Sequence, residues 1–177
     1  MPIGNRVTRG LARFGAISLS GTTLTASAAD LNAVVSGGAV IAKEFTFTEI
    51  AGAAVYTATA SLPAGATLHD IIINGVALWT SQTSATLIAG DAGDPDGYYT
   101  AVDLKATDLL AGESLSFALA GGKAGAYIAN SQVSPRYAAA ARDIVIVITK
   151  VGSTGTAGRT RATVMYSVPT ATAAVRV

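Results

Sequence analysis

The chain contains no cysteine and only one histidine, and aromatic and charged side chains are scarce among its 177 residues. Without cysteine there can be no disulfide bridge, thiol chemistry or Cys-ligated zinc, and a single histidine leaves too few ligands for a transition-metal site. Charged residues make up 13% of the chain, about half the share of a typical soluble domain. We therefore expect partners to cover part of the surface, and we predict no cofactor.

Long apolar runs are also missing from the chain. No stretch approaches the ~18 consecutive apolar residues that mark a membrane span, so no membrane partner is expected. The length suits one domain with an extension. Because small and β-branched residues must fill the core in place of large rings, the composition favours an architecture built from sheets.

Charge is unevenly distributed although the net charge is only +1. Arg6, Arg9 and Arg13 precede every acidic residue, whereas seven acids between residues 70 and 113 face only Lys105. Basic residues again dominate after residue 134. Two basic ends around an acidic middle would suit charge-complementary docking between neighbouring subunits. The alternative is that these charges are merely exposed to solvent and have no partner.

The first 42 residues differ in pattern from the rest. Residues 1–24 show isolated apolar residues among glycines, which predicts an extended basic arm. Ser27 and Asp30 resemble a capping box, and an apolar stripe at helical spacing follows them, which predicts a short helix over about 27–36. This helix would pack either on its own domain or on another subunit. We therefore divide the chain into an arm with a short helix, 1–42, and a β-domain, 43–177.

From Lys43 onward the apolar period changes to two, which indicates strands. The predicted strands cover residues 45–48, 55–60, 68–73, 76–79, 85–89, 98–103, 114–120, 126–130, 143–150 and 161–168. Asn74-Gly75 predicts a tight hairpin, and the run 144–148 is apolar on both faces and predicts a central strand. Many short strands between Gly, Pro and Asp turns predict an all-β sandwich or jelly roll, with the strand order left open.

Two places in the β-domain carry candidate chemistry. His69 is followed by Asp70, which would point to the opposite face of a strand. The chain also has no Gly-x-Ser-x-Gly nucleophile elbow. We therefore predict no catalytic residues. Asp91, Asp94 and Asp96 crowd a glycine-rich loop and could offer oxygen ligands to calcium. The loop lacks the glutamate of an EF-hand, and Asp-Pro-Asp-Gly is also ordinary turn chemistry in which Gly97 can adopt positive φ.

Two further segments have some features of binding sites. Residues 152–158 have the glycines of a phosphate-binding loop without its lysine or helix, and they predict a flexible hairpin tip. The arm has spaced arginines without interleaved aromatics, so it suits protein docking better than nucleic-acid binding. No nucleic-acid partner is expected.

Three segments resemble structural proteins of tailed bacteriophages. Residues 22–32 are similar to a segment near the N-termini of head fibres and decoration proteins. Residues 64–68 with 85–98, ending in Asp-Pro-Asp-Gly-Tyr, resemble small phage structural β-domains, and residues 146–166 resemble their closing hairpin. The resemblance implies a homo-oligomer, frequently a trimer, that binds the outer surface of the major capsid lattice and braces it against packaged DNA. It also implies a place on the capsid exterior of the virion, after synthesis in the host cytoplasm.

The function expected from this resemblance is that of a non-enzymatic decoration or cement protein, which stabilises the capsid shell by binding the major capsid protein. The residues expected to contact the capsid or another partner are Arg6, Arg9, Arg13, Phe14, Leu31, Val34 and Val35. The alternative is a host-attachment or carbohydrate-binding module of a head fibre or tail component. That module would need an exposed aromatic platform, for which Trp79 or the pair Tyr98-Tyr99 would have to serve.

Overall fold

The computed structural model of the protein describes residues 17–19, 22–24, 39–129, 135–152 and 154–168. The helix predicted over about 27–36 lies outside the described residues. So do all the predicted partner-contact residues, namely Arg6, Arg9, Arg13, Phe14, Leu31, Val34 and Val35.

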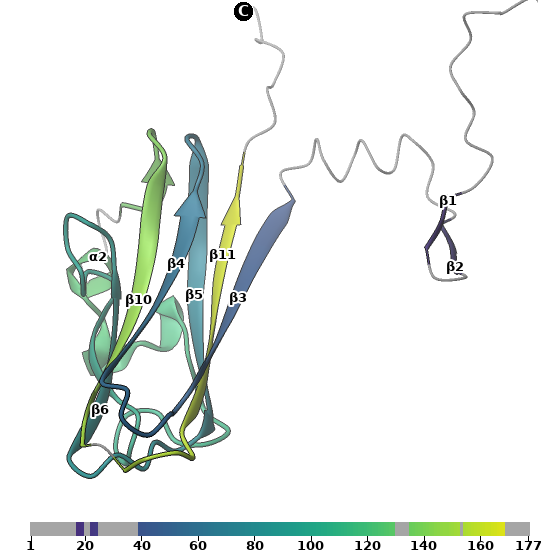
Figure 1. Ribbon diagram of the computed structural model, residues 1–177. Coiled ribbons are helices and arrows are strands. Elements are labelled where there is room, and N and C mark those ends of the chain that lie inside the picture. Colours follow the sequence, from purple (N-terminus) through teal and green to yellow (C-terminus); the bar gives the residue numbers. More distant parts are fainter. Residues whose placement is uncertain (1–16, 20–21, 25–38, 130–134, 153, 169–177) are drawn as a thin grey trace, which may run out of the picture.

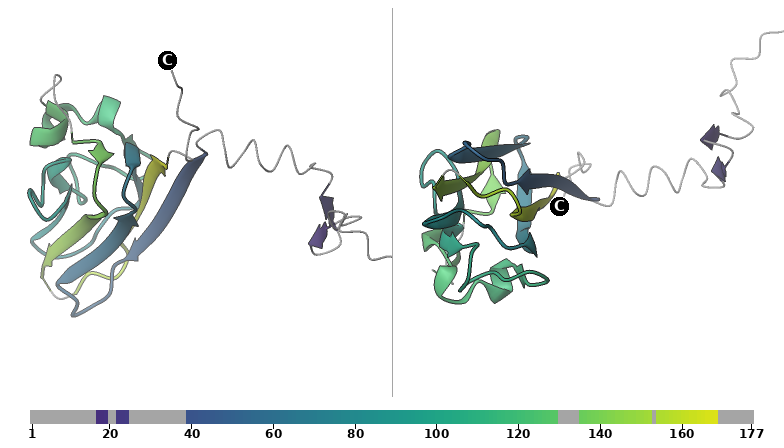
Figure 2. Two further views of the ribbon diagram at one scale, coloured as in Figure 1. Left: turned by 90° about the horizontal axis from the view of Figure 1, so that it is seen from above. Right: turned by 60° about the horizontal axis from the view of Figure 1, so that its bottom comes forward.

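Two antiparallel sheets face each other and form a β-sandwich (Figure 1, Figure 2). The first sheet has the order β3-β11-β5-β8, with β9 also pairing with β5, and the second has the order β4-β10-β6-β7. The strands are β3 (Val40–Thr48), β4 (Val55–Leu62), β5 (Ala66–Ala77), β6 (Ser84–Gly90), β7 (Tyr99–Asp103), β8 (Ser114–Leu115), β9 (Tyr137–Ala138), β10 (Arg142–Val151) and β11 (Arg159–Ser167). The all-β sandwich predicted from the sequence is confirmed.

The connections follow the jelly-roll pattern. With β9 set aside, the strands count from first to eighth along the chain, and the sheets then have the orders 1-8-3-6 and 2-7-4-5. Every connection between successive strands crosses from one sheet to the other except the one from β6 to β7, which are neighbours in the same sheet. The last two strands, β10 and β11, each insert between two earlier strands. Double Greek keys of this kind close a sandwich of short strands around one core.

The alternation of apolar residues explains why these segments form strands that pack on one face. Ile144, Ile146 and Ile148 of β10 are fully buried between the sheets, whereas Val145 and Val147 face outward and are half-buried. Strand β10 pairs with β4 on one side and β6 on the other, so its predicted central position is confirmed.

One side of the sandwich is closed by a short helical segment. It comprises η1 (Phe117–Leu119), η2 (Gly121–Lys123) and α2 (Ala126–Ala129), the last of which is labelled in Figure 1. η1 packs beside β5, and η2 packs beside β7. The strands predicted over 114–120 and 126–130 are therefore wrong beyond Leu115. Phe117 begins η1 just after β8 ends, and its buried ring stacks on Tyr98 with centroids 5.4 Å apart, a contact that local sequence does not reveal.

The hairpin predicted at Asn74-Gly75 is also wrong, because β5 continues without a break to Ala77. Gly75 is required there for close packing, since a Cβ on it would lie 2.3 Å from the carbonyl oxygen of Leu110. A register shift between β5 and β11 near Gly75 bends this end of the sheet. The Asn-Gly dipeptide suggested a turn, but the glycine is present here because of tertiary packing.

Residues 152–158 do not form a hairpin tip, because β10 and β11 belong to different sheets. The described residues 154–158 pack closely against buried side chains. A Cβ on Gly155 would lie 2.0 Å from Glu49 Oε1, and one on Gly158 would lie 2.6 Å from the Trp79 ring. The hairpin expected here from the sequence, both as a tip at residues 152–158 and as a closing hairpin over 146–166, is wrong.

Glu49 and Lys150 form an ion pair under this crossing segment. Both side chains are fully buried, with Lys150 Nζ 3.8 Å from Glu49 Oε1. Glu49 Oε2 accepts hydrogen bonds from the backbone N–H groups of Thr80 and Gly158, at 2.8 and 2.9 Å, and from the Thr80 hydroxyl at 2.9 Å. The pair therefore joins the end of β3 in one sheet to β10 in the other.

A small hairpin lies within the segment predicted to be an extended arm. Strands β1 (Ile17–Leu19) and β2 (Thr22–Leu24) pair with each other in a sheet of their own. In the ranges that the structure describes, no helix has the length and apolar character needed to cross a membrane.

Candidate interaction surface

The outer face of the sheet β4-β10-β6 is nearly free of charge. Register places Val145 beside Thr59 and Gly90, and Val147 beside Thr57 and Ile88. We call this surface the Thr/Val face, and it consists of Val55, Thr57, Thr59, Thr86, Ile88, Val145, Val147 and Thr149. Such a surface costs little to dehydrate, so it can adhere to another flat surface through burial alone.

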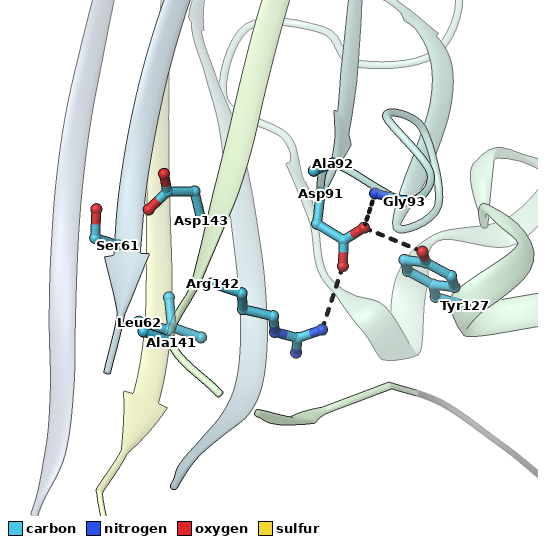
Figure 3. Close-up of a pocket in the computed structure, with 9 residues that line it drawn as sticks. All are labelled: Ser61, Leu62, Asp91, Ala92, Gly93, Tyr127, Ala141, Arg142 and Asp143. Carbon is cyan, nitrogen blue, oxygen red and sulfur yellow. Dashed lines mark hydrogen bonds and ion pairs between the residues drawn. The ribbon is translucent and has the colours of Figure 1, made fainter. Parts of the chain in front are cut away.

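A pocket of about 710 Å³ lies at one end of this face, where β4 ends and β10 begins (Figure 3). Its lining comes from four parts of the chain, and most of it is uncharged. The lining residues are Ser61, Leu62, Asp91, Ala92, Gly93, Tyr127, Ala141, Arg142 and Asp143. Ser61 and Asp143 are direct partners across the β4–β10 ladder.

Asp91 organises the far wall of this pocket. Its Oδ1 accepts hydrogen bonds from the backbone N–H of Gly93 at 2.9 Å and from the Tyr127 hydroxyl at 3.1 Å, and its Oδ2 lies 3.3 Å from Nη1 of Arg142 (Figure 3). Burial, together with this hydrogen bond to Asp91, raises the pKa of Tyr127. Asp91 is therefore held in place by the Gly93 backbone, the Tyr127 hydroxyl and Arg142, and the Arg142 guanidinium balances its charge.

The remaining carboxylates near the pocket are not neutralised in this way. In the described part of the chain no cation pairs with Asp143, which is exposed. Desolvation and the neighbouring carboxylates of Asp96 and Asp91 raise the pKa of Asp94. The rim of the pocket therefore carries an excess of negative charge that a cationic side chain would relieve.

The calcium interpretation of the loop gains no support from this geometry. Asp91 uses its oxygens within the protein, and the described ranges contain no group of three or more His, Cys, Asp or Glu side chains placed to hold a metal ion. Gly97 is not in a positive-φ conformation. It is needed because a Cβ at this position would lie 2.5 Å from the Tyr127 ring.

In the ranges that the structure describes, His69 has a hydroxyl neighbour but no carboxylate partner. Its Nε2 is 2.8 Å from Ser167 Oγ on an exposed part of the first sheet. The Asp70 carboxylate accepts hydrogen bonds from the backbone N–H groups of Ile71 and Phe117, so it does not orient the imidazole. The pair His69 and Ser167 therefore lacks the third member of a relay.

The aromatic platform required by the host-attachment alternative is not found at the predicted residues. Trp79, Tyr98 and Tyr99 are all buried in the core. Trp79 Nε1 donates to Thr160 Oγ1 at 2.9 Å, and the Tyr99 hydroxyl donates to the carbonyl of Ile71 at 2.6 Å. These rings stabilise the sandwich and cannot stack on a sugar.

The outer face of the first sheet differs from the Thr/Val face because it carries charge. Arg161 Nη1 lies 3.6 Å from Glu44 Oε2 in an exposed pair, and Arg159 and Arg161 border a shallow depression with Thr46 and Val76. The two faces of the sandwich therefore offer different chemistry to partners.

Sequence reasoning did not find the Thr/Val face or the pocket. The Thr and Val alternation was visible in β4 and β10, but it could not show that these strands are neighbours in one sheet. The pocket joins residues from positions 61 to 143, and only the strand order brings them together.

No protein-family model matches the chain, and no curated protein matches it. Three solved structures do. A chain in the acidic stable capsid structure of Helicobacter pylori bacteriophage KHP30 is 15% identical with a TM-score of 0.50, over 74% of this chain and 89% of that one.

The other two matches are more remote in structure. The cyanophage Pam1 capsid asymmetric unit contains a chain 24% identical with a TM-score of 0.45, over 73% of this chain and 84% of that one. The capsid of Ralstonia phage GP4 contains one 21% identical with a TM-score of 0.42, over 76% and 87%. At 15% identity, the likeness to the KHP30 chain shows a shared fold and nothing more. The Pam1 and GP4 chains are too distant in structure to support any conclusion.

Proposed function

We propose that the protein is a structural component of a bacteriophage virion that decorates the outside of the capsid and stabilises it by binding the major capsid protein. The observation that carries this proposal is the fold, which covers 89% of a chain in a phage capsid structure. Jelly-roll sandwiches are a common architecture of viral capsid proteins. The sequence resemblance to phage decoration proteins supports the same role independently.

The surface chemistry supports adhesion as the mechanism. The Thr/Val face presents β-branched side chains, and the outward-facing positions of β10 between Asp143 and Val151 carry no charge, since Lys150 points inward. Burial of apolar area at ~25 cal/mol per Å² would supply the adhesion, less the cost of ordering the partners. The protein works as a homo-oligomer, with a trimer as the expected form, and the arm of residues 1–42 reaches the capsid shell.

Binding to capsid shells prepared without the protein tests the proposal. Full-length protein should cosediment with shells and raise their melting temperature, and deletion of residues 1–20 should weaken that binding. The matched control is Arg159→Ala with Arg161→Ala, which removes positive charge from the other face and should leave binding intact. Absence of binding by the full-length protein would contradict the proposal, and unchanged binding after the deletion would contradict the role of the arm.

A further inference from the structure

The pocket lies at the end of the sandwich from which the N-terminal arm departs. Lys43 Nζ in β3 donates a 2.7 Å hydrogen bond to the carbonyl of Ser61, which lines the pocket. Strand β3 begins only three residues earlier, at Val40. The N-terminal arm therefore joins the sandwich beside this pocket.

The pocket is suited to an arginine side chain. Asp143 supplies an unpaired carboxylate and its ladder partner Ser61 a hydroxyl, and planar guanidinium groups bind such acceptors well. Leu62, Ala92 and Ala141 offer apolar surface to the aliphatic part of the side chain, and Tyr127 offers an aromatic ring.

The arm has the complementary chemistry. It carries Arg6, Arg9 and Arg13 with no acidic residue before Asp30. Because β1 and β2 fold back on each other, the reach is set by the 16 residues from Leu24 to Val40, which could span up to about 53 Å if extended, at ~3.3 Å per residue. Strand β10 has 10 residues, which corresponds to only about 33 Å at the same rise, so the arm can reach a neighbouring molecule.

We propose that the pocket receives an arginine of the N-terminal arm of a second copy of this chain. The contact is between different surfaces of identical molecules, and such head-to-tail contacts close into a ring when the rotation allows it. A ring of three would satisfy every arm and every pocket. This inference rests on the homo-oligomer of the proposed function, and it names the contact that holds the copies together.

Because the chain has no cysteine, paired cysteine variants test the contact directly in the full-length protein. Ser61→Cys is mixed in turn with Asn5→Cys, Thr8→Cys and Ala12→Cys, each of which lies next to an arm arginine that stays in place. The mixtures are held under mild oxidation, and disulfide-linked dimers are measured on a non-reducing gel. The matched control replaces Ser61→Cys by Glu44→Cys, an exposed position on the other sheet. Elution volume and circular dichroism verify that each variant is folded.

We expect at least one arm position to crosslink to Ser61→Cys about fivefold more than to the control, and Asp143→Asn to lower that yield about fivefold, as for loss of a modest ion pair. The inference is overturned if all three arm positions match the control. It is also overturned if crosslinks form only within one chain when both cysteines share it. Shell binding, measured separately on the same variants, distinguishes failure of this contact from failure of the proposed function.

Discussion

At the scale of single residues, the buried pair Glu49 and Lys150 carries the largest expected effect on stability. Lys150 Nζ also donates hydrogen bonds to the carbonyls of Ile50 and Gly155, at 2.8 and 3.1 Å. Removing one member of a fully buried pair leaves the other charge without compensation. The pair therefore holds the loops at this end of the sandwich in one arrangement.

Glu49→Ala should lower the free energy of unfolding by about 3–5 kcal/mol, because Lys150 would stay buried without its ionic partner. The control is Glu44→Ala, which removes the exposed partner of Arg161. This change should alter the free energy of unfolding by only about 0–1 kcal/mol. Urea unfolding followed by tryptophan fluorescence measures both. Equal losses in the two variants would contradict the account.

The same carboxylate predicts a loss of stability in acid. Burial opposes ionisation of Glu49, but the hydrogen bonds from Thr80 and Gly158 and the charge of Lys150 outweigh it and lower the pKa. Because the folded pKa lies below the unfolded value, the contribution is present above about pH 4.3 and is lost as pH falls through the folded pKa. Urea unfolding at pH 7 and at steps below pH 4.3 should show a fall that Glu49→Gln reduces, and an equal fall in that variant would refute this assignment.

Gly97 shows how a glycine can be required for packing. Gly97→Ala would place a methyl group 2.5 Å from the Tyr127 ring, and overpacking of this kind costs about 1–3 kcal/mol. The control Gly122→Ala meets no atom within 4 Å. Thermal unfolding should separate the two variants by several degrees, and similar melting temperatures would show that the α2 segment moves aside freely.

At the scale of elements, the strands were predicted well and their partners were not. Apolar periodicity correctly located β3, β4, β6, β7 and β11, and a continuous apolar run correctly located β10. The errors at residues 74–75, 117–119 and 126–129 share a physical cause, since packing against Leu110, Tyr98 and Asp96 decides the local structure there. Local sequence does not contain those contacts.

The Thr/Val face supplies the prediction at this scale. Val147 is half-buried and faces outward, so Val147→Glu should leave the fold intact while placing a charge in the middle of the face. Shell binding or self-association should fall at least tenfold, because an unpaired charge would have to be dehydrated in the contact.

Thr46→Glu, on the outer face of the other sheet, is the matched control for this change. It adds the same charge to an exposed strand position and should preserve both activities. Equal binding by the two variants would show that the Thr/Val face makes no contact in the assembly.

At the scale of the whole molecule, the chain places its charges and its apolar surface in separate regions. The Thr/Val face leads to a pocket with an acidic rim, and the arm with its three arginines begins at that same end. The opposite sheet presents Arg159 and Arg161 outward. The sequence showed this alternation of charge along the chain, but only the jelly-roll order shows which charges share an end.

A cryo-EM reconstruction of the intact particle tests most directly whether the protein is an adhesive part of a virus particle. We expect density for the β3–β11 sandwich on the outer surface of the shell, with copies in contact with one another and with the major capsid protein. Purified particles that lack this chain altogether, or that carry it only inside the shell, would contradict the account.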